Sequence, residues 1–401
     1  MPSSLQKITE FLLSFMLCLT LAGCGGESTA ASPAPEEDRT VYGIWWSYQE
    51  YEKYCTDLDE ETYRTVIQNA CDNLKDLGIN TVYIHAVSYT DAFYRSDIYP
   101  FTTHLGSCDY DPLAVWVELA HANDLKIEAW VNPMRSILVS ETDSLPDDFI
   151  VKQWIRENNE RIRQVNDRYY LNPAYQECRD LITSVVKEIA RNYDVDGIHM
   201  DDYFYPEGTE DNFDAYVFSK AQEENEELDR STFRINNVRE LVKEIHDTVK
   251  SAKSDLRYGI SPAGNMENNL LFYYADPSQW VKDGTVDYLE PQIYWGFEHP
   301  VKPYESTLEA WMEITEGTDV QMLPGLAAYK INTADAGTTE WQDNDDILAR
   351  QTQMAMEKGC DGVVYFDYEA LFDPAEENKE IVENEFLHIK NCIQDLQQNH
   401  S

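Results

Sequence analysis

The chain has 401 residues, of which 43% are hydrophobic and 12% aromatic, enough for one large domain or two modest ones. Its 74 acidic residues outnumber its 31 basic residues, and the formal net charge is -43. A field of this sign repels nucleic acid and anionic lipid headgroups, so we expect neither as a partner. We expect the substrate to be neutral or to meet a locally screened cleft.

The N-terminal residues are similar to a bacterial lipoprotein signal. The apolar run 11–22 is too short to span a bilayer and has the length of a signal peptide. It ends in Leu21-Ala22-Gly23-Cys24, small residues directly before a cysteine. We therefore expect residues 1–23 to be removed and Cys24 to carry lipid at the outer face of the cell membrane. An ordinary signal peptide with an incidental cysteine is the alternative.

Residues 24–40 are small, polar and proline-bearing, which predicts a flexible tether before a folded domain over 41–401. In that domain, strand-like and helix-like stretches alternate. Apolar, β-rich runs occur at 41–47, 81–87, 126–132, 197–202, 257–261, 288–295, 322–329 and 362–369. Amphipathic stretches with helical spacing occur at 62–77, 112–122, 175–193, 236–252, 345–358 and 376–396.

This strict order of strand then helix predicts an α/β fold, a (β/α)8 TIM barrel with parallel strands and right-handed crossovers. Two long insertions, 136–170 and 207–234, follow the third and fourth strands. Long excursions at the carboxyl end of barrel strands usually form the walls of a substrate cleft.

Six cysteines follow Cys24 without a CxxC pattern or a cysteine-histidine cluster, and we expect most of them to be free and structural.

The fourth strand carries the clearest chemical signal. Residues 196–206 read DGIHMDDYFYP, a short apolar run that closes on adjacent carboxylates, followed by aromatic residues. Carboxylates at a strand's end beside aromatic side chains suggest a sugar-cleaving site. The alternation of a strand points His199 and Asp201 to one face and Met200 and Asp202 to the other.

Several segments are similar to the glycosyl-hydrolase-like family 10 of bacterial lipoproteins. They include LGINTVYIHAVSYTDAFYRSDIYP, YDPLAVWVELAHANDLKIEAWVNPMR and YLNPAYQECRDLITSVVKEIARNYDVDGIHMDDYFYP, and the resemblance covers residues 43–312. It implies a barrel in an exported enzyme that acts on glycans, in some members on peptidoglycan strands stripped of their peptides. His85 stands where the family often has glutamine and Glu128 where it often has histidine, which bears on the substrate subsites.

Candidate catalytic residues follow from position along each strand. Gly-Ile-His-Met-Asp resembles the Gly-Phe-Arg-Leu-Asp strand of the α-amylase clan, which implies Asp201 as nucleophile or charge stabiliser. The fifth strand, GISPAG, has no acid. We therefore expect the general acid to be Glu290 or Asp202, with Asp367 third. Alternatively, Asp202 caps a helix or forms an ion pair. Glu290 could instead be a buried acid with a purely structural role.

Aromatic and polar residues at the same strand ends are candidates for substrate binding. The aromatic ones can stack on sugar rings, although some will belong to the core: Trp45, Trp130, Tyr203, Tyr205, Tyr294, Trp295 and Tyr329. The others can bond to sugar substituents: His85, Asn132, Arg135, His199, Gln292 and Asp367.

The sequence therefore favours a glycoside hydrolase that uses carboxylates and needs no cofactor or metal. Two alternatives remain open. His85, His199, Asp201 and Asp202 are residue types that ligate metal in a barrel hydrolase or deacetylase. A catalytically silent glycan-binding lipoprotein is the other, since the fifth strand lacks an acid and fold alone does not prove activity.

Overall fold

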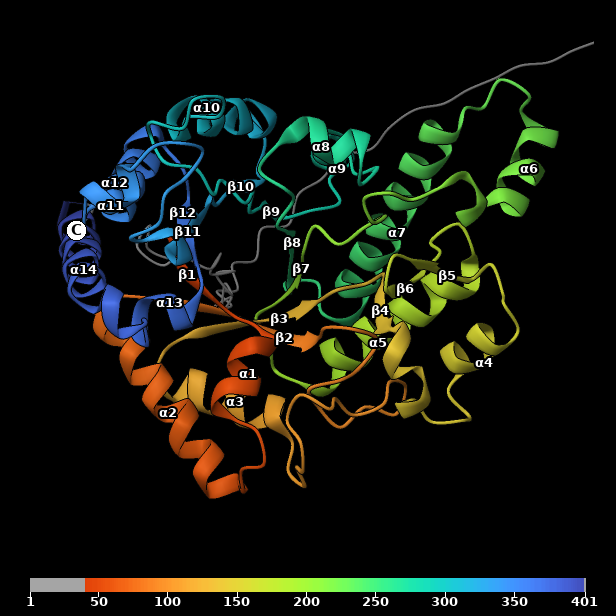
Figure 1. Cartoon of the computed structure of the whole chain (residues 1–401), viewed down its shortest axis with the longest axis horizontal. Coiled ribbons are helices and arrows are strands. Elements are labelled where there is room, and N and C mark those ends of the chain that lie inside the picture. Colours follow the sequence, from red (N-terminus) through yellow and green to blue (C-terminus); the bar gives the residue numbers. More distant parts are fainter. Residues whose placement is uncertain (1–39, 400–401) are drawn as a thin grey trace, which may run out of the picture.

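The computed structural model describes residues 40–399, which are built around a parallel β-sheet (Figure 1). The strand order is β10-β9-β8-β7-β3-β2-β1-β12-β11. The strands are β1 (Val41–Trp46), β2 (Thr81–Val87), β3 (Lys126–Val131), β7 (Gly197–Met200), β8 (Arg257–Ile260), β9 (Tyr288–Leu289), β10 (Gln321–Met322), β11 (Gly325–Ala327) and β12 (Gly362–Phe366).

The sheet closes on itself because β10 and β11 are two parts of one segment, interrupted at Leu323 and Pro324. β10 pairs with β9, and β11 pairs with β12. The N–H of Leu323 donates to the carbonyl of Leu289 at 2.9 Å, while the N–H of Val364 donates to the carbonyl of Pro324 at 3.1 Å. The segment thus fills one strand position, and the described residues form the eight-stranded barrel that the sequence predicts.

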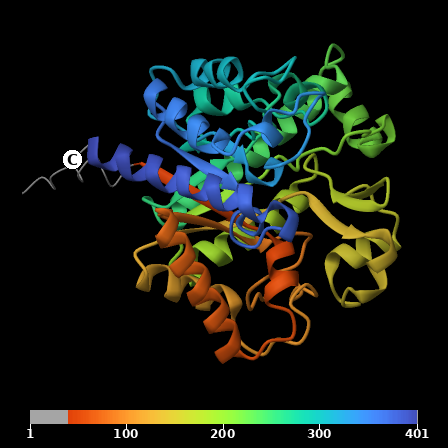
Figure 2. The ribbon, with the colours of Figure 1, turned by 60° about the vertical axis from the view of Figure 1, so that its left-hand side comes forward.

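Helices surround the barrel, and Figure 2 brings α14 forward, which contacts both α2 and α12 and so joins the two ends of the ring. Their bounds are α1 (Tyr48–Tyr54), α2 (Glu60–Leu77), α3 (Pro112–Ala122), α5 (Gln176–Asn192), α7 (Arg230–Ala252), α8 (Met266–Leu271), α9 (Pro277–Asp283), α10 (Tyr304–Thr315), α11 (Glu340–Asp343), α12 (Ile347–Lys358), α13 (Tyr368–Phe372) and α14 (Lys379–Asn399), with short 3-10 turns η4 (Ala328–Lys330) and η5 (Glu376–Asn378).

Helix α2 shows how local sequence sets these elements. The side chain of Asp59 accepts a hydrogen bond from the N–H of Thr62 and caps the first turn. Gly78 ends the helix with φ 96°, a left-handed conformation that favours glycine. The apolar side chains recur at helical spacing and are buried against the barrel: Tyr63, Ile67, Ala70, Cys71, Leu74 and Leu77.

Two glycines leave room inside the barrel for large polar side chains. A Cβ atom at Gly197 would lie 2.3 Å from Oε2 of Glu128, and one at Gly259 would lie 2.2 Å from the ring of Tyr288. The interior below the strand ends therefore holds Glu128 and Tyr288, whose hydroxyl donates to the Glu128 carboxylate at 2.6 Å. Arg257 Nη1 donates to the same carboxylate at 3.0 Å, so this buried acid is paired.

The first insertion folds as a small antiparallel sheet in the order β4-β6-β5, beside the barrel. It contains β4 (Arg135–Leu138), η2 (Val139–Ser144), α4 (Ile150–Arg156), β5 (Ile162–Val165) and β6 (Arg168–Leu171). The second insertion contains η3 (Asp211–Phe213) and α6 (Ala215–Glu224). Both follow the strands expected from the sequence, since β4 comes after β3 and η3 after β7.

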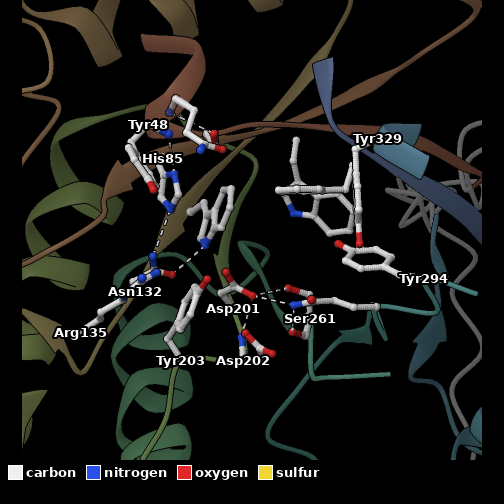
Figure 3. A pocket seen from close by; sticks show the side chains of 16 residues that line it. Tyr48, His85, Asn132, Arg135, Asp201, Asp202, Tyr203, Ser261, Tyr294 and Tyr329 are labelled. Atoms are coloured by element: carbon white, nitrogen blue, oxygen red, sulfur yellow. Dashed lines mark hydrogen bonds between the residues drawn. The ribbon is translucent and has the colours of Figure 1, made fainter. Parts of the chain in front are cut away.

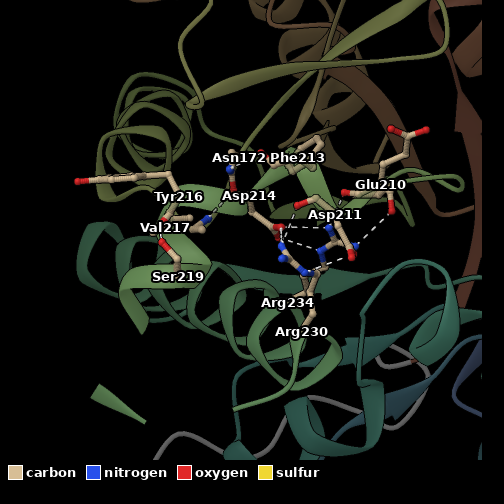
Figure 4. A network of polar contacts seen from close by, with 12 residues as sticks. Asn172, Glu210, Asp211, Phe213, Asp214, Tyr216, Val217, Ser219, Arg230 and Arg234 are labelled. Carbon is tan, nitrogen blue, oxygen red and sulfur yellow. Dashed lines mark hydrogen bonds and ion pairs between the residues drawn. The ribbon is translucent and has the colours of Figure 1, made fainter. Parts of the chain in front are cut away.

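A buried ion-pair network holds the second insertion to α7 (Figure 4). Arg234 is 1% exposed and donates to Asp214 through Nε at 2.8 Å and Nη2 at 3.1 Å. Arg230 Nη1 donates to Asp214 Oδ1 at 2.5 Å. Arg234 also donates to the carbonyl of Glu210 at 2.7 Å, so one guanidinium fixes both the loop and the helix start.

The expected strands at 288–295 and 322–329 differ from the structure. Regular pairing in the first covers only β9, because Pro291 lacks an N–H and the chain turns there. The second is interrupted at Pro324 for the same reason.

The cysteines that the structure describes are all free thiols: Cys55, Cys71, Cys108, Cys178, Cys360 and Cys392. Within residues 40–399, no helix is long and apolar enough to cross a membrane.

Candidate active site

A cavity of about 340 Å³ opens where the barrel strands end, a size within the range of small-molecule sites, roughly 300–1,000 Å³. Its side chains come from the carboxyl-terminal parts of the barrel strands and from the segments that follow them. They are Trp45, Ser47, Tyr48, Gln49, His85, Trp130, Asn132, Arg135, Asp201, Asp202, Tyr203, Ser261, Gln292, Tyr294, Tyr329 and Phe366. Figure 3 shows Asp201 and Asp202 between the wall with Tyr203 and Arg135 and the wall with Tyr294 and Tyr329.

Asp201 and Asp202 both border the cavity, so the expectation that they face opposite sides is wrong. The strand β7 ends at Met200, and the alternation of side chains does not continue past it. Oδ1 of Asp201 accepts hydrogen bonds from the N–H of Asp202 at 2.7 Å and from Gln292 Nε2 at 2.8 Å. The two carboxylates therefore lie side by side at one strand end.

Burial raises the pKa of both carboxyl groups, and the charge of Asp202 raises that of Asp201 further. Asp201 is only 6% exposed. The pair therefore keeps one proton at a pH at which an isolated carboxyl group has lost it. Arg135 acts in the opposite direction, because its positive charge lowers the pKa of both groups.

One wall of the cavity is aromatic. The rings of Tyr294 and Phe366 are stacked with centroids 5.9 Å apart, and Tyr329 meets Tyr294 edge-on at 5.7 Å. Trp45 meets Phe366 edge-on at 5.7 Å. Tyr329 is 46% exposed and lies at the rim. Flat apolar faces of this kind suit the faces of sugar rings.

The other wall carries polar groups held in fixed orientations. His85 stacks on Trp130 with ring centroids 3.4 Å apart, and its Nδ1 accepts the N–H of Tyr48 at 2.9 Å. Asn132 Oδ1 accepts from Trp130 Nε1 at 2.9 Å. Burial holds the pKa of His85 well below its usual range, so this imidazole is neutral. Nearby, Cζ of Arg135 lies 4.0 Å from the centroid of the Tyr203 ring.

A hydrogen-bonded chain runs beneath the aspartates. Ser261 lies within 3.5 Å of Asp201 Oδ1, and its hydroxyl is 3.1 Å from His199 Nε2. His199 Nδ1 is 3.0 Å from the hydroxyl of Tyr288, and Trp45 Nε1 donates to Nε2 at 3.2 Å. Burial lowers the pKa of His199 to about 3, so the ring is neutral and joins the cavity floor to the barrel interior.

Glu290 lies below the cavity and does not border it. Its side chain is fully buried, and neither carboxyl oxygen has a hydrogen-bond partner among the described residues. Nδ1 of His199 is 3.3 Å from Oε2. Burial raises the pKa of Glu290 well above its usual range, and the nearby Glu128 raises it further. Glu290 is therefore a neutral acid in the barrel interior, one layer deeper than expected from the sequence.

Four other expected site residues also lie away from the cavity lining. His199 is the buried link described above. Tyr205 is buried against Phe213 and Tyr274, with ring centroids 5.4 and 5.3 Å away. Trp295 lies near Gly264, where a Cβ atom would be 2.8 Å from its ring. The fourth, Asp367, directly precedes helix α13.

Asp367 caps α13, and its Oδ1 accepts the N–H of Ala370 at 3.1 Å. Burial raises its pKa to about 6. Glu50 is buried nearby and accepts from the hydroxyl of Ser47 at 2.5 Å. Burial and the charge of Asp367 raise the pKa of Glu50 to about 7. Asp367 and Glu50 thus form a second buried acid pair, and Glu50 holds the loop after β1 through Ser47.

Five residues that were not expected from the sequence also border the cavity: Ser47, Tyr48, Gln49, Ser261 and Phe366. The first four end a predicted strand or follow one directly, and that position was the available signal, whereas Phe366 lies inside the predicted run 362–369. Ser47 also begins a Ser-x-x-Glu capping box with Glu50, which fixes the start of α1.

Within residues 40–399, no group of three or more histidine, cysteine, aspartate or glutamate side chains has the arrangement of a metal site.

Comparison with known proteins relates the sequence to glycosyl hydrolases. A family model described as glycosyl hydrolase-like 10 matches residues 40–343. Glycosyl hydrolase YngK of Bacillus subtilis (strain 168) is 31% identical over 316 residues, 72% of this chain and 60% of YngK, so the match spans less than two thirds of that relative. Glycosyl hydrolase DigH of Escherichia coli (strain K12) is 29% identical over 400 residues, 87% of this chain and 90% of DigH.

Solved structures share the fold. The PgaB (BpsB) glycoside hydrolase domain from Bordetella bronchiseptica gives a TM-score of 0.58 at 14% identity, over 86% of this chain and 99% of that one. The β-galactosidase from the psychrophilic Marinomonas ef1 gives 0.56 at 13% identity, over 89% of this chain and 61% of that one. At such identities the likeness concerns the barrel alone.

Proposed function

Since the chain belongs to the glycosyl hydrolase-like 10 family, we propose that it is a glycoside hydrolase that cleaves O-glycosidic bonds in a bacterial cell-wall or related glycan. The observation that carries this proposal is the pair Asp201 and Asp202 at the end of β7, beside an aromatic wall in a cavity of about 340 Å³. Buried carboxyl groups with raised pKa values are suited to general acid catalysis near neutral pH.

The surroundings of each aspartate support different roles. Asp201 Oδ1 accepts hydrogen bonds from the Asp202 N–H and from Gln292, and such donors favour the charged carboxylate. The two groups share one proton, and we assign it in the catalytically active form to Asp202, which donates it to the glycosidic oxygen. Asp201 stabilises the positive charge that develops on the sugar ring.

The position of the pair also bears on the nucleophile. Enzymes with two separate carboxylates place them on opposite sides of the scissile bond, roughly 5 to 9.5 Å apart. Asp201 and Asp202 are adjacent, and no other carboxylate in the described part of the chain borders the cavity. A sugar with a 2-acetamido group brings its own nucleophile, its carbonyl oxygen, as in the known substrate-assisted glycosidases.

We therefore infer a substrate with 2-acetamido sugars. The acetamido oxygen attacks the anomeric carbon while Asp202 protonates the leaving oxygen, and Asp201 accepts the acetamido N–H. Asp202 next takes a proton from water, which attacks the anomeric carbon and reopens the ring formed in the first step. The anomeric configuration is retained, because inversion occurs twice.

Release of reducing ends tests this proposal. The protein is incubated with N-acetylated glycans, including peptide-free peptidoglycan strands, and with the same glycans after removal of their acetyl groups. We expect cleavage of the acetylated glycans with retained anomeric configuration, measured by NMR. Cleavage with inversion would contradict the acetamido step. Binding without cleavage would favour a silent glycan-binding protein, and loss of activity in a chelator would favour a metal-dependent hydrolase.

The cellular location is a separate proposal. The apolar run 11–22 followed by Cys24 supports export and attachment to the outer face of the cell membrane through lipid on Cys24. Residues 1–23, Cys24 and almost all of the tether lie outside the residues that the structure describes. A tether of this composition leaves the barrel free to reach a glycan near the membrane.

A further inference from the structure

Four polar side chains form a relay that runs down the barrel interior from the cavity floor. Ser261 Oγ lies 3.1 Å from His199 Nε2, and His199 Nδ1 lies 3.0 Å from the hydroxyl of Tyr288. That hydroxyl donates to Glu128 Oε2 at 2.6 Å. Arg257 donates to the other oxygen of Glu128 at 3.0 Å. This interior relay therefore joins a residue that borders the cavity to an ion pair below it.

The direction of the hydrogen bonds in the interior relay follows from Trp45. An indole N–H can only donate, and that of Trp45 donates to His199 Nε2 at 3.2 Å. Burial lowers the pKa of His199 to about 3, so the ring is neutral and carries a single N–H. Nε2 is therefore the acceptor, also for the hydroxyl of Ser261, and the ring hydrogen is on Nδ1.

The lower end of the interior relay fits this direction. Because the hydroxyl of Tyr288 gives its hydrogen to Glu128, its oxygen is free to accept the Nδ1–H of His199. Both side chains are built into the barrel. A Cβ atom at Gly197 would lie 2.3 Å from Oε2 of Glu128, and one at Gly259 would lie 2.2 Å from the ring of Tyr288. Glycine at these two positions thus makes room for the relay.

The direction matters at the cavity because Ser261 is also 3.5 Å from Asp201 Oδ1 (Figure 3). Its hydroxyl has one hydrogen, which goes to His199 while Nε2 is an acceptor. Asp201 Oδ1 then accepts from two N–H groups of other residues. With the ring hydrogen on Nε2, the hydroxyl of Ser261 would instead become a third donor to Asp201. A third donor would lower the pKa of Asp201 and weaken the charge that it offers to a sugar.

The same reversal would disturb the cavity wall. An N–H at Nε2 of His199 would face the N–H of Trp45, and two donors repel each other at 3.2 Å. The indole borders the cavity and would have to move. One hydrogen on one ring nitrogen therefore governs both an aromatic wall residue and the surroundings of Asp201.

We propose that His199 and Tyr288 are positioning residues for the reaction at Asp201. Anchored by Glu128, the hydroxyl of Tyr288 keeps the ring hydrogen of His199 on Nδ1. Nε2 then holds the hydroxyl of Ser261 and the indole of the cavity wall in place. Neither His199 nor Tyr288 is among the residues that border the cavity, so both act through others. The inference rests on the proposed function, since it concerns the charge that Asp201 supplies there.

The position of the ring hydrogen can be measured by NMR in the full chain with isotope-labelled histidine nitrogens. The signals of His199 are assigned by their absence in His199→Gln. We expect hydrogen on Nδ1 and none on Nε2 near neutral pH. In Tyr288→Phe the Nδ1–H loses its acceptor, so the fraction of rings with hydrogen on Nε2 should rise.

Tyr83 offers a matched control. It is fully buried in the same interior cluster as Tyr288, and its hydroxyl has no hydrogen-bond partner among the described residues. Tyr83→Phe should leave the ring hydrogen of His199 and the rate of reducing-end release as they were. In Tyr288→Phe we expect kcat to fall roughly 10-fold with KM nearly unchanged, because the positioning acts on the transition state.

A double-mutant cycle tests whether Tyr288 acts through Ser261. If it does, Tyr288→Phe combined with Ser261→Ala should lose little more activity than Ser261→Ala alone. A loss equal to the product of the two single losses would mean independent effects and would overturn the positioning role. The unfolding midpoint of each variant shows that the comparison is made on folded protein.

The remaining outcomes separate this inference from the proposed function. Hydrogen on Nε2 in the unsubstituted protein would overturn the relay and leave the hydrolase standing. An unchanged ring in Tyr288→Phe would assign the Nδ1–H to Glu290, whose Oε2 is 3.3 Å away, and would overturn the role of Tyr288. A protein that cleaves no glycan, yet has the Nδ1 hydrogen and loses it in Tyr288→Phe, would overturn the proposed function and support the relay.

Discussion

Gln292 Nε2 donates a hydrogen bond to Asp201 Oδ1 at 2.8 Å and so links the loop after β9 to the carboxylate after β7. The same oxygen accepts the N–H of Asp202 at 2.7 Å. With Oδ1 occupied by protein donors, Oδ2 is the oxygen that remains for the substrate. The charge and the orientation of Asp201 are therefore set before any sugar binds.

Replacing Asp201 by asparagine should reduce cleavage by several orders of magnitude while sugar binding persists. Asparagine keeps the size and the Oδ1 acceptor but removes the negative charge that stabilises the transition state. Release of reducing ends gives the rate, and calorimetry gives the affinity. A near-normal rate in a correctly folded Asp201→Asn protein would contradict the proposed hydrolase mechanism.

The pH dependence of kcat should reveal the proton that Asp201 and Asp202 share. The pair must hold one proton, so kcat should fall as pH rises through the raised pKa of the pair, above the usual carboxyl range. Asp202→Asn removes the group that holds the shared proton, so the raised pKa of the pair is lost. On activated aryl glycosides, which need no protonation, this variant should lose the alkaline limb of its pH–rate profile. An unchanged alkaline limb would assign the proton to another group.

The variant Glu290→Gln tests whether Glu290 is a catalytic acid or a buried structural acid. Loss of a general acid costs roughly 10²- to 10⁴-fold in rate, whereas we expect a change of less than about 5-fold, because Glu290 lies below the cavity and is already neutral. A loss in the larger range, relieved on activated aryl glycosides, would restore Glu290 as the acid.

The same variant should also change the pH dependence of stability. The pKa of Glu290 is raised in the folded state, so above its unfolded pKa the folded protein binds more protons than the unfolded one. Its contribution is fully present below the unfolded pKa and declines as pH rises towards the folded pKa. Relative to the unsubstituted protein, Glu290→Gln should therefore gain stability with rising pH, measured by urea unfolding at pH 5 to 8.

The Arg234–Asp214 pair should be important for stability. Arg234→Met leaves a buried carboxylate without its main partner, which typically costs roughly 3–5 kcal/mol. Arg239→Gln, which breaks an ion pair with Asp283 on the outside of the same helix, is the matched control and should cost about 1 kcal/mol or less. Equal effects on the unfolding midpoint would contradict the importance of burial.

Cys24→Ala tests the membrane anchor. Two or more lipid chains on one cysteine suffice for stable attachment, even for a strongly acidic domain on a flexible tether. We expect the unsubstituted protein in the membrane fraction and the variant in the soluble fraction after cell breakage. A variant that remains fully membrane-bound would show that another segment anchors the chain.

The fold was predictable because the sequence alternates between the two periodicities of strands and helices. The runs at 81–87 and 112–122 coincide with β2 and α3. Asp201 could be found because a carboxylate at the end of a barrel strand has few structural uses. The position of Glu290 in a strand-like run marked it as a candidate acid, but position in the sequence gives no height along the barrel. Glu290 lies beneath the cavity that Gln292 and Tyr294 border.

The residues that were missed or misplaced lie where regular strands have ended. Beyond Met200, turn geometry decides the direction of Asp202 and Tyr205, and no periodic rule applies. Ser261 was overlooked because its hydroxyl matters only through partners from other strands. Those partners, His199 and Asp201, come from the preceding strand end, a proximity set by the closed barrel.

The cavity is lined by two separate parts of the chain, which makes the candidate site modular. Asp201 and Asp202 follow a barrel strand, whereas Arg135 begins an insertion whose strands pair among themselves. We therefore expect exchange of residues 135–171 for another small folded insertion to change the wall of the cavity without moving the aspartates. Changes in this insertion, by evolution or by engineering, can thus vary the ligand selectivity of the cavity while the barrel and its aspartates stay the same.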